Sequence, residues 1–83
     1  MPLLRLLKEA GDWGLGADEV QWILYFRDPT SRTGWKAYSF VRSTRDILAR
    51  CMREKGVGDA AARFLLAGLP STFDEWKTPQ ARS

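Results

Sequence analysis

Basic and aromatic side chains alternate through the middle of the chain, a combination that could bind nucleic acid. Arginine and lysine hold phosphate groups, and aromatic faces stack on bases. Residues 27–55 contain eight basic and three acidic residues and stand at +5, whereas the rest of the chain stands at −2, which accounts for the net charge of +3. A local excess of this kind can steer an anionic partner. The candidate nucleic-acid-binding residues are Arg27, Arg32, Lys36, Arg42, Arg45, Tyr25, Trp35 and Tyr38.

The residues usually needed for catalysis are largely missing. The 83 residues include no histidine and one cysteine, Cys51. The chain therefore lacks the usual acid–base group for neutral pH and cannot assemble a Cys–His nucleophile or a zinc site by itself. Adjacent acidic pairs do not face each other on a helix or strand, and no glycine-rich phosphate motif is present. We expect a protein that is not an enzyme, with no catalytic residues, metal site, cofactor or small-molecule substrate.

Most of the candidate residues fall on a predicted antiparallel β-hairpin at 20–42. Residues 20–27 are rich in β-branched and aromatic side chains, residues 28–34 are typical of a turn, and residues 35–42 form the partner strand. Alternation places Val20, Trp22, Leu24 and Phe26 on one face of the first strand. In the second strand, alternation places Lys36, Tyr38, Phe40 and Arg42 on one face and Trp35, Ala37, Ser39 and Val41 on the other. Which face of the hairpin is buried stays open at this stage.

Short helices are predicted around the hairpin. They cover residues 44–55, 59–69 and 72–77, and residues 2–10 can form another before a loop at 11–18. The expected caps are Ser43 or Thr44, then Asp59, and finally Thr72, which forms a capping box with Glu75. The expected inward-facing residues are Ile47, Leu48, Cys51 and Met52, then Phe64, Leu65 and Leu69.

These elements predict a single small α+β domain over residues 1–83. In it the antiparallel hairpin packs against two or three short helices, and residues 78–83 form a frayed tail.

Two short resemblances point toward nucleic acid. Residues 36–42 resemble the RNP1 signature of RNA-recognition motifs, which implies stacking aromatics on a central strand. That fold also needs a strand and a helix earlier in the chain, where the sequence is short and rich in glycine. Separately, residues 25–29, 34–36 and 39–40, followed by a capped helix, look like the arm-type DNA-binding domain of phage integrases. This second resemblance implies a three-stranded sheet that enters the major groove.

The alternative function is a protein-interaction or regulatory module that can form a homodimer. If helices cover one face of the hairpin, the other face, with Ile23, Tyr25 and either Trp35 or Tyr38, stays apolar and partly exposed. An exposed apolar patch usually meets a partner or a second copy.

The expected location is the cytoplasm. A single cysteine permits no intrachain disulfide, which a secreted domain of this size would usually need. No apolar run reaches the ~20 residues that span a bilayer, so no membrane is expected as a partner.

Overall fold

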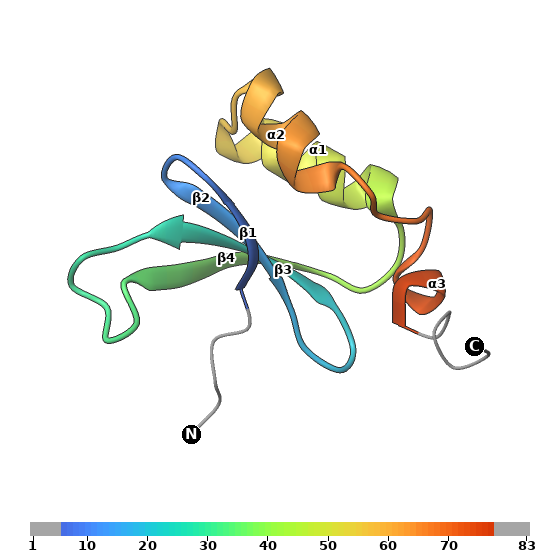
Figure 1. The fold of residues 1–83 in the computed structure, drawn as a ribbon, viewed down its shortest axis with the longest axis horizontal. Coiled ribbons are helices and arrows are strands. Elements are labelled where there is room, and N and C mark those ends of the chain that lie inside the picture. The colour runs from blue at the N-terminus through green and yellow to red at the C-terminus, as the bar shows by residue number, and fades with distance from the viewer. Residues whose placement is uncertain (1–5, 78–83) are drawn as a thin grey trace.

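Residues 6–77 fold as four strands followed by three helices (Figure 1). The computed structural model describes residues 6–77. The predicted tail at 78–83 and residues 2–5 of the predicted N-terminal helix lie outside this range. The strands are β1 (Leu6–Ala10), β2 (Trp13–Ala17), β3 (Trp22–Arg27) and β4 (Trp35–Val41), and the helices are α1 (Arg45–Lys55), α2 (Asp59–Leu66) and α3 (Phe73–Lys77).

The four strands form one antiparallel sheet in chain order, with β1 and β4 at its edges. The predicted hairpin is the β3–β4 half of this sheet. The expected α+β class, a hairpin packed against short helices, is therefore confirmed.

The segment before the hairpin is where the prediction was wrong. Residues 6–10 form β1 instead of part of a helix, and β2 replaces the expected loop. The turn between the two strands contains Gly11 with φ of 64°, a conformation that glycine adopts without steric cost. Three closely spaced glycines had indicated a loop, but only the first of them lies in a turn.

Gly14 makes room for side chains from other strands. A Cβ at this position would lie 2.8 Å from Leu6 Cδ1 and 3.2 Å from Trp35 Cζ3. A leucine from β1 and an indole from β4 therefore rest directly on the β2 backbone, which is a recognised reason for glycine within a strand. The contact also explains why Trp35 is only 8% exposed.

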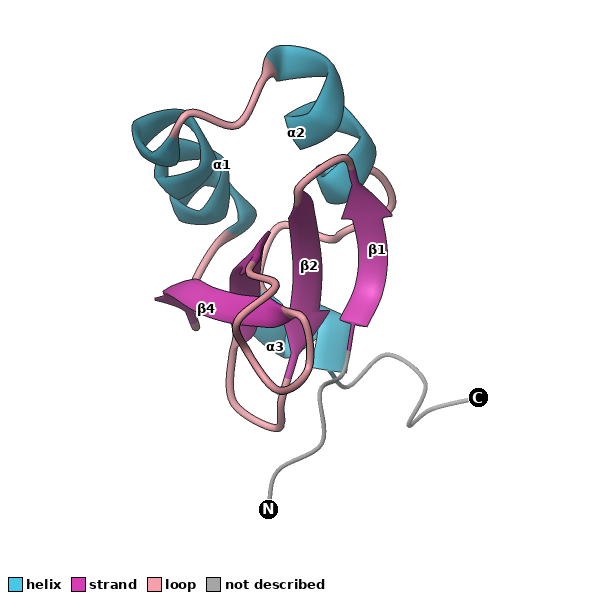
Figure 2. Cartoon of the chain, turned by 90° about the vertical axis from the view of Figure 1, so that its left-hand side faces the viewer, coloured by secondary structure: helices cyan, strands magenta, loops and turns pink. Residues whose placement is uncertain are grey.

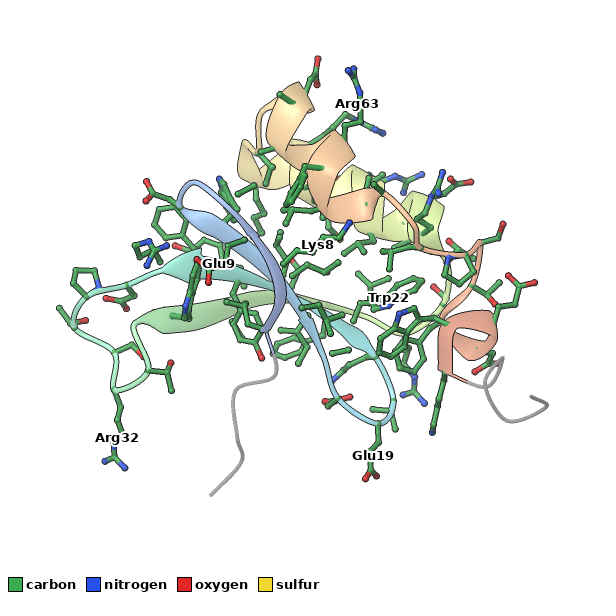
Figure 3. All side chains as sticks on the ribbon, viewed as in Figure 1. Lys8, Glu9, Glu19, Trp22, Arg32 and Arg63 are labelled. Atoms are coloured by element: carbon green, nitrogen blue, oxygen red, sulfur yellow. The ribbon has the colours of Figure 1, made fainter. Side chains whose placement is uncertain are left out.

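Helices α1 and α2 cover one face of the sheet, and α3 closes the end near Trp22 (Figures 1 and 3). The core between the layers joins apolar side chains of β2, β3 and β4 to those of all three helices. Trp22 meets Phe73 edge to face, with ring centroids 5.4 Å apart. The buried Trp22 Nε1 has no hydrogen-bond acceptor, so apolar packing alone holds this ring.

A bulge in β4 changes which residues share a face. Leu24 pairs with Ser39 and the next residue, Tyr25, pairs with Ala37, so Tyr38 is the extra residue. The predicted common face of Trp35, Ala37, Ser39 and Val41 is therefore wrong, because strict alternation does not continue through a bulge. Opposite the helices, β4 presents Trp35, Ala37 and Phe40.

Two of the three predicted helix caps are confirmed. Thr44 caps α1 by accepting a hydrogen bond from the Ile47 backbone N–H at 3.2 Å. Thr72 and Glu75 form the capping box of α3, with reciprocal bonds of 3.1 and 3.3 Å. The expected Asp59 cap is wrong: Gly58 is the N-cap residue of α2, and no side chain bonds there. The Asp59 carboxylate lies in the first turn instead, near the positive end of the helix dipole.

Helix α2 stops at Leu66 and not at residue 69, because Ala67 is extended and Gly68 has a φ of 84°; Lys8 caps the end that results. Its ammonium group donates to the backbone oxygens of Phe64 and Ala67 at 2.9 and 2.6 Å. The Phe64 oxygen also accepts a long bond of 3.4 Å from the Ala67 backbone N–H, and a cation at this end of a helix interacts favourably with the helix dipole. A side chain from an edge strand thus completes a helix distant in sequence.

The predicted inward-facing residues of the helices are only partly correct. Leu48, Met52, Leu65 and Leu69 are buried, and Cys51 is half-buried. By contrast, Ile47 and Phe64 are exposed. The Phe64 ring lies beneath the Lys8 ammonium group, 5.1 Å from it, so this ring packs on a cation at the surface and not in the core.

Candidate nucleic-acid interface

The face of the sheet opposite α1 and α2, here called the far face, presents the most exposed aromatic ring. Figure 2 shows the two helices together on the other side of the strands. Phe40 is 58% exposed and pairs with Ile23, while Tyr25 is the next residue of β3 on the same face. The two aromatic rings are therefore diagonal neighbours on adjacent strands. The pairing places on the far face Leu6, Glu9, Gly14, Gly16, Ile23, Tyr25, Arg27, Trp35, Ala37 and Phe40.

Tyr25 remains a neutral phenol on this face. Partial burial raises its pKa above the ordinary value of 10.0, and the negative charge of Asp18 raises it further. The side chain therefore offers both an aromatic face and a hydroxyl group that can donate a hydrogen bond.

Arg27 lies over the indole of Trp35, with 4.4 Å between Cζ and the ring centroid. Its Nη2 is 3.3 Å from Glu9 Oε1, and its Nε is 3.7 Å from Asp12 Oδ1. Two of the predicted site residues thus form one stacked unit, in which the cation is partly neutralised and the indole is mostly covered.

Tyr38 lies on the helix side of the sheet, away from Tyr25 and Trp35. Its ring stacks on Phe26 at 5.6 Å and meets Trp13 edge to face at 5.9 Å. The Lys55 ammonium group lies 5.7 Å from the ring centroid. The bulge is the reason for this position, since Tyr38 is the residue that it displaces from the regular pairing.

Arg45 holds the fold together at the junction of α1 and α3. Its Nη1 donates to the Leu69 backbone oxygen at 3.0 Å, and its backbone N–H donates to the Ser71 oxygen at 2.8 Å. An antiparallel bridge between Thr44 and Thr72 lies beside it. This arginine has a structural role that the sequence did not reveal.

The remaining predicted cations lie around the β4 edge. Arg32, Lys36 and Arg42 are exposed, and their side chains form no hydrogen bond or ion pair within residues 6–77. Figure 3 shows Arg32 at the tip of the β3–β4 loop, pointing away from the body of the protein. These three cations are here called the β4 rim; Arg32 and Arg42 are free to meet an anion, whereas the positive charge of Lys36 helps to lower the pKa of Asp28.

The structure therefore brings together only part of the predicted set. Tyr25, Arg27 and Trp35 share the far face, the β4 rim borders it, and Tyr38 and Arg45 lie elsewhere. Phe40 was missing from the predicted set although it is the most exposed of the large apolar side chains in residues 6–77. The sequence feature that could have indicated Phe40 is an aromatic residue placed between Ser39 and Val41. Alternation alone had grouped it with Tyr38 on one face of the strand.

Comparisons with known proteins give no match, whether to family models, to curated proteins or to solved structures. The order of elements is four strands and then three helices, which lacks the helix between strands that the RNP1 resemblance requires. Between residues 6 and 77, no group of three or more acidic or cysteine side chains could hold a metal ion. In the same part of the chain, no helix is long and apolar enough to cross a membrane.

Proposed function

We propose that this protein is a non-enzymatic binding module that holds single-stranded nucleic acid on the far face and the β4 rim. The observation that carries the proposal is Phe40, an aromatic ring 58% exposed on a sheet face that α1 and α2 leave uncovered. Solvent-exposed rings of this size gain little for the fold, whereas base–aromatic stacking is worth about 1–3 kcal/mol per base.

The rim cations complement the ring. Arg42 follows β4 directly, and Lys36 lies in the same strand. A strand of nucleic acid lying across Phe40 would bring its phosphates toward Arg42, whose side chain forms no hydrogen bond or ion pair within residues 6–77, whereas Lys36 pairs with Phe26 on the helix side of the strand. Phosphate contacts supply affinity without sequence preference, so we expect binding that tolerates many sequences.

The two edges of the sheet favour use of its face. Edge strand β4 carries the bulge at Tyr38, and β1 has an irregularity between Leu6 and Lys8. Each edge strand also carries a charged side chain. Bulges and charges on edge strands oppose the addition of a further strand, so a ligand that pairs with the backbone is disfavoured.

The test is fluorescence anisotropy with labelled single-stranded oligonucleotides and the matched duplex at two salt concentrations. Phe40→Leu should weaken binding about tenfold through loss of stacking, and Arg42→Ala should weaken it and reduce its salt dependence. Phe64→Leu is the matched control, because Phe64 is 53% exposed but lies on α2. Absence of binding at low salt, or equal effects of the two phenylalanine variants, would refute the proposal.

A second candidate is a protein-interaction or regulatory module that forms a homodimer through the same face. It is favoured by the exposed Phe40 ring; Ile23, with which Phe40 pairs, was expected to be partly exposed but is only 7% exposed and adds little to this surface. Sedimentation velocity distinguishes the two, since self-association that Phe40→Asp abolishes would support this candidate, and a monomer at high concentration would oppose it.

We place either activity in the cytoplasm. The reason is the single cysteine, because a small secreted domain would usually rely on disulfide bonds.

A further inference from the structure

We propose that Glu9 and Asp12 act as an internal anion that competes with nucleic-acid phosphate for Arg27. The two carboxylates would then set the affinity of the far face by opposing the ligand. This inference rests on the proposed function and names a regulatory element within the same site.

The ion pairs around Arg27 are loose enough to be exchanged. The contact with Glu9 is 3.3 Å and that with Asp12 is 3.7 Å, and all three side chains are partly exposed. Strong charge-assisted hydrogen bonds are shorter, about 2.7–2.9 Å, and exposed pairs contribute little to stability. A phosphate oxygen could therefore replace either carboxylate at low cost to the fold.

The guanidinium group uses only part of its hydrogen-bonding capacity within the protein. Its Cζ lies 4.4 Å from the centroid of the Trp35 ring, a cation–π contact that restrains the group. Nη2 bonds to Glu9 and to the Gly11 backbone oxygen, and Nε is directed at Asp12. Nη1 makes no hydrogen bond within residues 6–77, so its two protons are available to a phosphate while the stack remains intact.

The local charge works against an incoming phosphate. One guanidinium beside two carboxylates has a net charge of −1, whereas the same site with two amides would be +1. Glutamine and asparagine keep an acceptor oxygen for Arg27 and remove only the charge. The double variant Glu9→Gln/Asp12→Asn therefore separates repulsion of the ligand from support of the arginine.

The experiment compares this double variant with a control that changes net charge equally. Glu54→Gln/Asp59→Asn provides the control, because these acidic residues lie on α1 and α2. Anisotropy with a single-stranded oligonucleotide at low salt should show ~5-fold tighter binding for the Glu9/Asp12 variant than for the control. The gain should shrink at high salt, since exposed charges are screened, and circular dichroism should show that both variants are folded.

A third arm removes the arginine. In an Arg27→Gln background, the Glu9/Asp12 substitutions should no longer tighten binding beyond the control. If the wild-type protein binds but the two double variants have equal affinity, this inference is overturned and the proposed function stands. If neither the wild type nor any variant binds at low salt, the proposed function itself is refuted. If the Glu9→Gln/Asp12→Asn variant binds and neither the wild type nor the control does, the result would support both the proposed function and this inference.

Discussion

At Gly14 a hydrogen atom in place of a side chain decides where Trp35 can lie. The indole crosses from β4 to the backbone of β2, and Leu6 approaches the same point from β1. One side-chain-free position thus allows residues of two outer strands to meet on the far face. The stacked Arg27 depends on this arrangement, because the indole beneath it is held in place by the contact.

Gly14→Ala should therefore destabilise the protein by about 1–3 kcal/mol, the usual cost of an added methyl group in a packed region. Urea unfolding measures the change. Gly58→Ala is the control, because a Cβ there meets nothing within 4 Å and φ is −65°. We expect the control to lie within about 0.5 kcal/mol of wild type, and equal effects at the two positions would contradict the packing argument.

Asp18 fixes the turn between β2 and β3. Its Oδ1 accepts hydrogen bonds from the backbone N–H groups of Val20 and Gln21 at 2.8 and 3.0 Å, and its Oδ2 accepts one from the Gln21 side chain. The bond from Val20 is the main reason that the Asp18 pKa lies below its ordinary value of 3.8. The ionised carboxylate is thus favoured in the folded state.

This pKa predicts a pH dependence of stability. Because the folded-state pKa is lowered, the contribution of Asp18 is complete above the ordinary value of 3.8 and is lost as the pH falls through the folded value. Unfolding curves of Asp18→Asn should decline less than those of wild type over that acid range. Glu54→Gln serves as the control. Identical acid profiles for wild type and Asp18→Asn would show that the Asp18 turn does not contribute to the pH dependence of stability.

At the scale of elements, strand β1 and helix α2 stabilise each other through Lys8. The helix is only eight residues long, and isolated helices of that length are unstable in water. The two hydrogen bonds from Lys8 satisfy carbonyls at its C-terminus. An edge strand that the sequence did not predict is therefore part of what defines the end of α2.

Lys8→Met should lower the free energy of unfolding by about 1 kcal/mol, since it removes a charge and two hydrogen bonds at the helix end. Lys36→Met is the matched control, because that exposed side chain forms no hydrogen bond within residues 6–77. Chemical denaturation of both variants provides the comparison. A Lys8 variant as stable as the Lys36 variant would show that the cap is dispensable.

Across the whole molecule, the strands and helices differ in local stability. Strands β2 and β3 have hydrogen-bonded neighbours on both sides, and their Leu15 and Leu24 side chains are fully buried. Helix α3 has five residues and is joined to the rest by Phe73 and a short bridge at Thr72. Local opening should therefore begin at α3 and reach the central strands last.

Hydrogen–deuterium exchange tests this order. Backbone amides of β2 and β3 should exchange slowest, and those of α3 should exchange fastest among the helices. Thr72→Ala removes one side of the capping box and should speed exchange in α3 while leaving β3 unchanged. Protection of α3 equal to that of β3 would mean that the molecule opens only as one unit.

Local patterns were sufficient for the hairpin and the helices. Trp22 and Leu24 share one face of β3 as alternation predicted, although which face is buried had been left open, and Thr44 and Thr72 cap their helices. Each of these predictions depends on side chains close in sequence. The failures had a different cause, since β2 carries two glycines and β1 has a mixed apolar pattern, and only a neighbouring strand explains either as a strand.

The candidate site was less predictable than the fold. Sequence analysis placed most candidate residues on the hairpin but could not anticipate that the bulge would move Tyr38 to the helix side. It also could not show that Arg45 bonds to Leu69 or that Arg27 is held by acidic residues from the first hairpin. These are contacts between segments far apart in the chain.

The α+β class, the β3–β4 hairpin and two helix caps follow from the amino-acid sequence, because hydrophobic alternation, turn residues and capping groups act over a few neighbouring residues. The tertiary structure alone decided that glycine-rich residues form a strand, that Phe40 is presented on the far face, and which cations are free. Those outcomes depend on what lies across the sheet from each residue, and strand register fixes that only when the chain is folded.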